Sequence, residues 1–224
     1  MAAEEARRPT GPPPGERLAG RLAAEEPRRR RIPRAKAITA LTELGQLDLA
    51  IYGAVAETPT PTLDSPLRRL SRLADRSRLW LGIAAAMAAV GGRQGRRAAG
   101  AGLVALAVDS AVVNVGFKLA ARRRRPDRDS ARVPALRQVP MPDSASFPSG
   151  HAASGFAFAN AVGQTLPTVA APLRLLASVV GYSRVHTGVH YAGDVVMGAT
   201  IGASIGDLVG WGLSRPRRPG AGAR

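Results

Sequence analysis

A histidine and an aspartate near the end of the chain could act together on a phosphate. His190 and Asp194 are four residues apart, which makes them neighbours on one face if the segment is helical. A carboxylate in that position can hold the imidazole in one tautomer and stabilise its protonated form. Arg184 lies shortly before them, and its guanidinium can bind two phosphate oxygens. Alone, the pair could equally be a structural His–Asp hydrogen bond.

A second histidine stands where a helix is expected to begin. Pro148, Ser149, Gly150 and His151 precede an apolar run, so Ser149 is a candidate N-cap. The first turn of a helix presents free N–H groups and the positive end of the dipole, which bind anions. His151 could reach a group that is bound there. Taken alone, the motif is also compatible with a simple capped turn.

A third group of polar residues supplies further cations. Lys118 follows an apolar run, and Arg125-Pro126 ends a run of four arginines. Arginines after a membrane helix are usually topogenic, and residues 122–124 are interpreted in that way. The third histidine, His186, is assigned no role beyond lining the region.

Taken together, the three groups resemble the three-part signature of the type 2 phosphatidic acid phosphatases. The matching positions are Lys118, Arg125, Pro126, residues 148–151, Ser183, Arg184, His190 and Asp194. That family shares a superfamily with vanadium-dependent haloperoxidases and bacterial class A acid phosphatases. Every signature position matches in type and spacing. The firm match covers residues 118–194, and the apolar segments around it agree with the helical core of the family.

The resemblance implies a role for each matched residue. His190 would be the nucleophile that forms a phosphohistidine, and Asp194 would orient it. His151 would protonate the leaving alkoxide and then help to activate water. The phosphate oxygens would be held by Lys118, Arg125, Ser149, Gly150 and Arg184. No Asp/Glu cluster suited to Mg²⁺ lies near these motifs, so neither a metal nor another cofactor is expected.

The elements around the motifs indicate a membrane protein. Five apolar segments are separated by polar residues: 79–92, 98–117, 152–166, 167–182 and 195–213. Several are shorter than the roughly 20 residues that cross a bilayer. Their succession, with arginines at several boundaries, including a predicted loop at residues 93–97, still favours a polytopic protein. We therefore predict an all-α membrane bundle of five to six helices.

Four glycines recur every fourth residue in the last apolar segment, at 198, 202, 206 and 210. A glycine inside a water-exposed helix costs about 1 kcal/mol relative to alanine. In a membrane bundle the same residues let two backbones approach closely. They predict a helix that packs tightly against a neighbour.

Four regions are expected along the chain. Residues 1–36 read as a disordered basic tail, because their composition cannot bury enough apolar surface. Residues 37–78 are predicted to form amphipathic interfacial helices, the second starting at Asp64-Ser65-Pro66. Residues 79–213 form the membrane-embedded core, and residues 214–224 a basic C-terminal tail.

Composition narrows the function classes. The absence of cysteine excludes disulfides and thiolate metal sites, and the net charge of +16 suits anionic partners. Nucleic acid is not expected, because aromatic interleaving is absent and basic residues flank apolar segments. A non-enzymatic basic lipid- or nucleic-acid-binding protein is the alternative from another class. Phosphotransfer, or haloperoxidase-like oxidation, is the second enzymatic alternative.

We therefore expect a metal-independent phosphatase of a lipid phosphomonoester or diphosphate in the cell membrane. Phosphatidic acid, phosphatidylglycerol phosphate and polyprenyl phosphates would all satisfy the site, and a cell-envelope lipid is favoured by composition typical of a high-GC bacterium. The family pattern places the site at the extracytoplasmic face. Both basic termini favour the cytoplasmic side, but five spans would place the termini on opposite sides of the membrane. Either residues 37–56 form a sixth span, or one terminus departs from the rule that basic flanks stay inside. The oligomeric state is left open.

Overall fold

The computed structural model describes residues 34–117 and 123–214. The chain divides into two units, Met1–Thr42 and Glu43–Arg224. Helix α2 (Arg34–Glu57) begins in the first unit, and everything below concerns the second. Lys118, and most of the predicted basic tails, lie outside the described residues.

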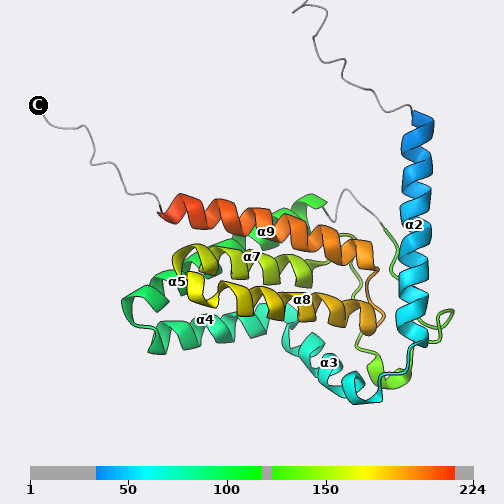
Figure 1. Ribbon diagram of the computed structural model, residues 1–224, viewed down its shortest axis with the longest axis horizontal. Helices are drawn as coiled ribbons and strands as arrows, with labels where there is room; N and C mark the ends of the chain where they lie inside the picture. Colours follow the sequence, from blue (N-terminus) through cyan, green and yellow to red (C-terminus); the bar gives the residue numbers. More distant parts are fainter. Residues whose placement is uncertain (1–33, 118–122, 215–224) are drawn as a thin grey trace, which may run out of the picture. The chain divides into compact units, whose positions relative to one another are not determined.

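Every regular element in the described ranges is helical, as predicted. After α2 the elements are α3 (Pro61–Leu73), η1 (Asp75–Ser77), α4 (Arg78–Val90), α5 (Gly92–Ala111), η2 (Val112–Phe117), η3 (Ala135–Arg137), α7 (Gly150–Thr165), η4 (Pro167–Val169), α8 (Ala170–His186) and α9 (Ala192–Ser214). Helix α7 packs against α5, α8 and α9, and Figure 1 shows these helices lying alongside one another. The helices that carry the second and third motifs are therefore in direct contact.

The glycine face of α9 packs against the backbone of α7. A Cβ atom at Gly198 would collide with the carbonyl oxygen of Ser149, and one at Gly202 with that of Ala153. A Cβ atom at Gly206 would meet the next turn of α7 in the same way. The predicted close packing of this helix is confirmed.

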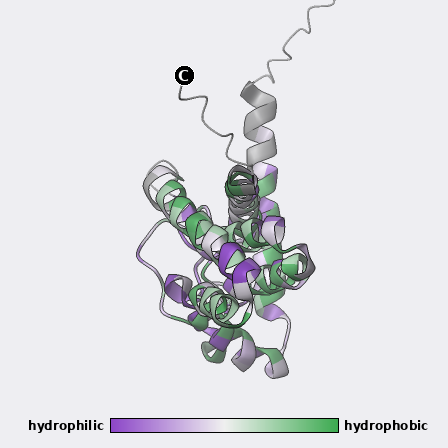
Figure 2. Ribbon diagram, turned by 90° about the vertical axis from the view of Figure 1, so that its left-hand side faces the viewer, coloured by the Kyte–Doolittle hydropathy of each residue, from purple (hydrophilic) through white to green (hydrophobic). Residues whose placement is uncertain are grey.

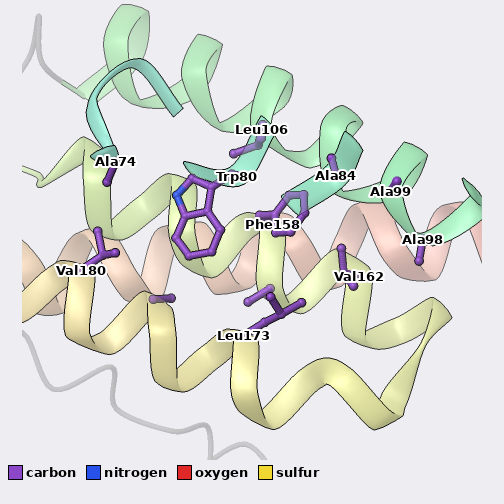
Figure 3. Close-up of a cluster of buried hydrophobic side chains, with 12 residues drawn as sticks. Ala74, Trp80, Ala84, Ala98, Ala99, Leu106, Phe158, Val162, Leu173 and Val180 are labelled. Atoms are coloured by element: carbon purple, nitrogen blue, oxygen red, sulfur yellow. The ribbon is translucent and has the colours of Figure 1, made fainter. Parts of the chain in front are cut away.

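The main apolar core is built largely from small and aliphatic side chains around one aromatic pair. Trp80 of α4 and Phe158 of α7 are fully buried, with ring centroids 5.6 Å apart (Figure 3). Val162, Leu173 and Val180 surround them together with several alanines. This agrees with the low aromatic content, which leaves small side chains to fill the space between helices.

Two sequence-based boundaries were wrong. Helix α3 begins at Pro61 rather than near Asp64, because a proline costs no hydrogen bond at the first helical position. Asp64 therefore lies inside the first turn, where it accepts a hydrogen bond of 2.8 Å from the Thr60 hydroxyl. The arginines of residues 93–97 lie in the first turns of α5 rather than in a loop. The chain reverses just before them, with Gly92 at φ 58°.

In the described ranges, one helical segment, Ala192–Leu213 of α9, is long and apolar enough to cross a membrane. Helices α4, α7 and α8 contain 13, 16 and 17 residues, fewer than the roughly 20 that a perpendicular span requires. Large apolar side chains are nevertheless exposed on α5, α8 and α9. Figure 2 shows that hydrophobic residues are frequent along the helices. The number of spans stays a prediction.

The packing of α9 on α7 can be tested by adding one methyl group. Gly202→Ala should lower the free energy of unfolding by about 1–3 kcal/mol, since a backbone oxygen cannot move aside as a side chain can. Gly100→Ala in α5 is the matched control, because nothing lies within 4 Å of its Cβ position. Thermal unfolding in detergent measures both. Equal stability of the two variants would contradict the close contact.

Candidate active site

His190 lies in the turn between α8 and α9, and only 2% of it is exposed. Its Nε2 atom is 3.2 Å from Nη1 of Arg125, and its Nδ1 atom is 3.4 Å from Oδ2 of Asp194. A guanidinium can only donate, so Nε2 presents its lone pair. The proton of the neutral ring is therefore on Nδ1 and faces the carboxylate.

The two residues do not share a helical face, because the segment that joins them is not helical throughout. Helix α9 starts at Ala192, so Asp194 is in its first turn and His190 precedes it. The turn is set by Gly188 at φ 73°, and the carbonyl of Arg184 accepts the N–H of His190 at 3.2 Å. His190 and Asp194 are in contact because the loop before α9 folds back onto the start of that helix.

Asp194 is fully buried and accepts several hydrogen bonds besides the contact with His190. Ser146 Oγ donates to its Oδ2 atom at 2.5 Å, and the Tyr191 N–H donates to the same atom at 3.0 Å. Arg123 Nη1 donates to Oδ1 at 2.7 Å. A carboxylate with this many partners is held in one orientation. Ser146 and Arg123 were both missed as contributors to the site.

Arg123 also connects the site to α2. Its Nη2 atom donates to Oδ2 of Asp48 at 2.8 Å, and Oδ1 of Asp48 accepts the Gly193 N–H at 2.7 Å. Its guanidinium lies 4.2 Å from the ring centroid of Tyr191. Residues 122–124 were interpreted only as a basic flank that sets membrane topology, and for Arg123 this leaves out its contacts with Asp194 and Asp48. Nothing in a run of four arginines distinguishes it from its neighbour Arg124.

His151 lies in the first turn of α7 and is paired with an aspartate that the motifs do not contain. Its Nε2 atom is 2.8 Å from Oδ1 of Asp75 in η1. The same oxygen is 3.6 Å from Nη1 of Arg184, which also donates to the Ser71 hydroxyl at 2.5 Å. Asp75 thus links the second motif to the third. No spacing rule points to it, because it lies far upstream of both.

Two buried donors at the site have no hydrogen-bond partner in the described part of the chain. They are the Ser149 hydroxyl and Nε of Arg184, each on a side chain that is at most 1% exposed. Ser149 occupies the N-cap position of α7, but its side chain makes no capping bond. Buried donors are normally satisfied, so an added acceptor such as a phosphate oxygen would complete the hydrogen bonding of these two.

The charges of the site follow from burial and pairing. Burial lowers the pKa of His190 to about 4, so the imidazole is neutral at neutral pH. The hydrogen bond from His151 holds the pKa of Asp75 below its usual range, so Asp75 is ionised there. A neutral imidazole with an available lone pair, such as His190, suits a nucleophile. An imidazole beside an ionised carboxylate, such as His151, suits an acid.

Two cavities border these residues. The first, of about 410 Å³, is lined by Ala74, Arg76, Ser77, Asp109, Ser110, Val113, Gly150, His151 and Ser154. The second, of about 510 Å³, is lined by Arg123, Arg124, Arg125 and residues 141–145. The two cavities share none of these residues, and one borders His151 while the other borders Arg125.

His186 contacts a different set of residues. Its Nε2 atom is 3.2 Å from Oδ1 of Asp64 and 3.0 Å from the Thr60 hydroxyl. Arg137, which is 1% exposed, donates to the same carboxylate oxygen at 2.8 Å. These contacts join α8, α3 and η3. The structure therefore gives His186 a structural role.

Comparisons with known proteins identify the family of this chain. The family model of the PAP2 superfamily matches residues 98–215. A decaprenylphosphoryl-5-phosphoribose phosphatase of Mycobacterium tuberculosis is 34% identical over 184 residues, covering 78% of this chain and 96% of the relative. Its counterpart in Mycolicibacterium smegmatis is 38% identical over 152 residues, covering 67% and 78%.

A solved structure shows the same fold. The transmembrane PAP2 type phosphatidylglycerolphosphate phosphatase of Bacillus subtilis superimposes with a TM-score of 0.60 at 25% identity, covering 78% of this chain and 89% of that one. By its family match and its relatives, this chain belongs to the PAP2 superfamily, and it is a phosphoric monoester hydrolase of that family.

Proposed function

We propose that this chain is a membrane-bound lipid phosphate phosphatase that works without a metal, through a phosphohistidine. The observation that carries the proposal is the site itself. A buried, neutral His190 faces Arg125, and two unpartnered buried donors lie on the neighbouring motif residues Ser149 and Arg184. His151, the candidate acid, lies in the first turn of α7, next to Ser149.

His190 attacks in the first step. The lone pair on its Nε2 atom forms the bond to phosphorus while the bond from phosphorus to the leaving oxygen breaks. Arg125 Nη1, which faces that lone pair now, turns to the phosphate oxygens when the substrate binds. The proton stays on Nδ1, where Asp194 balances the positive charge that develops on the ring. Ser146 and Arg123 keep that carboxylate in place.

His151 carries the protons. It donates one to the leaving alkoxide in the first step and accepts one from water in the second, when the water oxygen displaces the histidine nitrogen from phosphorus. Asp75 is a positioning residue for His151, because its carboxylate stabilises the protonated imidazole at 2.8 Å. Asp75 also holds Arg184 toward the same region.

The remaining residues bind the equatorial phosphate oxygens. Arg125, Arg184, the Ser149 hydroxyl and the Gly150 N–H form the described part of this cradle, and Lys118 is proposed to complete it. Fixed donors of this kind stabilise the charge of phosphoryl transfer at low reorganisation cost. In a serine protease, loss of one oxyanion-hole donor reduces the rate by roughly 10²–10³.

The lipid nature of the substrate is supported by the relatives. The mycobacterial relatives are named for a decaprenylphosphoryl phosphoribose, and the Bacillus subtilis protein for phosphatidylglycerolphosphate. We propose a multi-pass arrangement with residues 79–213 in the membrane and the site at the extracytoplasmic face. The headgroup then enters the site while the lipid chains stay in the bilayer.

Removal of the nucleophile gives the first test. His190→Ala should reduce phosphate release from phosphatidic acid or phosphatidylglycerol phosphate to background, with thermal unfolding in detergent still cooperative. His186→Gln is the matched control, because His186 is equally buried but bonded to Asp64 and Thr60. It should lose stability and keep its turnover number. A His190→Ala protein that retains turnover would disprove the assignment.

The second test concerns Asp75, the carboxylate that contacts His151. Asp75→Asn should lower kcat by on the order of 10-fold, the lower end of the loss seen when a carboxylate partner of a metal-bound histidine is removed. It should also move the basic limb of the pH–rate profile to lower pH, since the protonated form of His151 loses its stabilising charge. Asp75→Glu should restore part of both effects, and the exposed Asp129→Asn should change neither. An unshifted profile in Asp75→Asn would contradict this role.

The cationic cradle gives the third test. Activity should survive EDTA, because arginine and lysine side chains carry the stabilising charge. Orthovanadate should inhibit competitively, since its five-coordinate adduct on a histidine resembles the transition state. A strict requirement for Mg²⁺, or indifference to vanadate, would count against the mechanism.

A further inference from the structure

Asp48 of α2 precedes the range that the family model matches, yet it contacts the start of α9. Its Oδ1 atom accepts the Gly193 N–H at 2.7 Å, and its Oδ2 atom accepts a hydrogen bond from Nη2 of Arg123 at 2.8 Å. Asp48 is 8% exposed, and a Cβ atom at Gly193 would collide with its carboxylate. The first N–H groups of a helix have no partner within that helix. Asp48 therefore caps α9 from a different helix.

A single guanidinium is shared by two carboxylates at this point. Arg123 donates to Oδ1 of Asp194 through Nη1 at 2.7 Å, and to Asp48 through Nη2. Both oxygens of Asp48 accept from N–H donors, as the oxygens of an ionised carboxylate do. Two carboxylates and one guanidinium leave the group with one excess negative charge. Because both carboxylates are buried, water and salt screen this charge only weakly.

The excess charge lies beside the ring that becomes positive in the proposed reaction. Oδ2 of Asp194 is 3.4 Å from Nδ1 of His190, whereas Arg123 binds the other oxygen of the same carboxylate. When Nε2 bonds to phosphorus, the proton on Nδ1 stays and the ring becomes a cation. If Arg123 were paired with Asp194 alone, their charges would cancel. A second carboxylate on Arg123 is therefore what leaves a negative charge for the ring.

From these contacts we infer that Asp48 is a positioning residue for the reaction, because by sharing Arg123 it keeps a net negative charge beside His190 and so stabilises the cationic phosphohistidine. No bond to Asp48 or Arg123 forms or breaks. The inference rests on the proposed phosphohistidine mechanism, and it adds a residue from outside the range matched by the family model. It differs from a role in folding alone, in which Asp48 would only cap α9.

Asp48→Asn separates the two roles, because the asparagine oxygen can still accept the Gly193 N–H while the charge is lost. With phosphatidic acid in mixed detergent micelles, kcat and kcat/KM should both fall by on the order of 10-fold, since a neighbouring charge changes the balance between charged and neutral histidine by a factor of about 10 or more. An equal fall in both is typical of an interaction made only in the transition state.

Orthovanadate provides a readout that a role in folding alone would not change. Its adduct with Nε2 places the same positive charge on the ring, so its affinity should fall in Asp48→Asn by a factor similar to that for kcat/KM. Glu43→Gln is the matched control, because it removes an exposed carboxylate from the same helix. It should change neither turnover nor vanadate affinity. Thermal unfolding in detergent verifies that each variant is folded.

The decisive comparison adds a second substitution. In Asp48→Asn/Arg123→Gln one charge of each sign is removed, so Asp194 alone again supplies one negative charge. The double variant should therefore have a higher kcat/KM than Asp48→Asn, although it lacks one more contact with Asp194. If Asp48→Asn does not fold, the same comparison starts from Arg123→Gln, whose kcat/KM the added Asp48→Asn should raise.

The possible failures are distinct. A folded Asp48→Asn protein with the turnover and vanadate affinity of the wild type would overturn the inference. A double variant less active than both single variants would also overturn it, because that result indicates that the contacts matter and the net charge does not. Both results leave the phosphatase function intact. Absence of phosphate release from phosphatidic acid and phosphatidylglycerol phosphate by folded wild-type protein would instead overturn the proposed function.

Discussion

The contact between the backbones of α7 and α9 is the constraint on which the site depends. Gly198 lies against the carbonyl of Ser149, so no side chain separates the helices at that point. Just beyond it, the N–H of Ser149 donates to the carbonyl of Asp194 at 2.9 Å. The first turns of the two helices are thereby fixed against each other. His151 and the turn that carries His190 are positioned by these same turns.

Buried charge then holds His190 in place. Asp194 and Asp48 are both buried, and Arg123 binds one oxygen of each. Removing charges from water is costly, and the loss of one partner leaves another charge uncompensated. The arrangement therefore has little freedom to relax. Because Asp48 belongs to α2, the helix that precedes the family core takes part in orienting the dyad.

The short segment η1 borders both His151 and the cavity next to it. Asp75 contacts His151 and Arg184, while the two following residues line the cavity next to His151. Any movement of this segment would change the acid and the cavity together.

The sequence by itself determined the family, the helical class, the glycine face and the order of the motif residues. These properties are local: apolar periodicity and glycine spacing each depend on residues close together in the chain. The motif set was recognisable because unusual residue types recur at set distances. The roles of His190, His151 and the phosphate-binding residues stay predictions, and Lys118 lies outside the described ranges.

Only the tertiary structure decided which ordinary residues support these motifs. Asp48, Asp75, Ser146 and Arg123 carry no local pattern, and Asp48 lies 145 residues from its partner Gly193. Aspartates and arginines at helix ends are common, so the few that become buried partners cannot be separated from solvated ones by spacing. Their roles follow from which helices pack together, and that packing is a property of the whole chain.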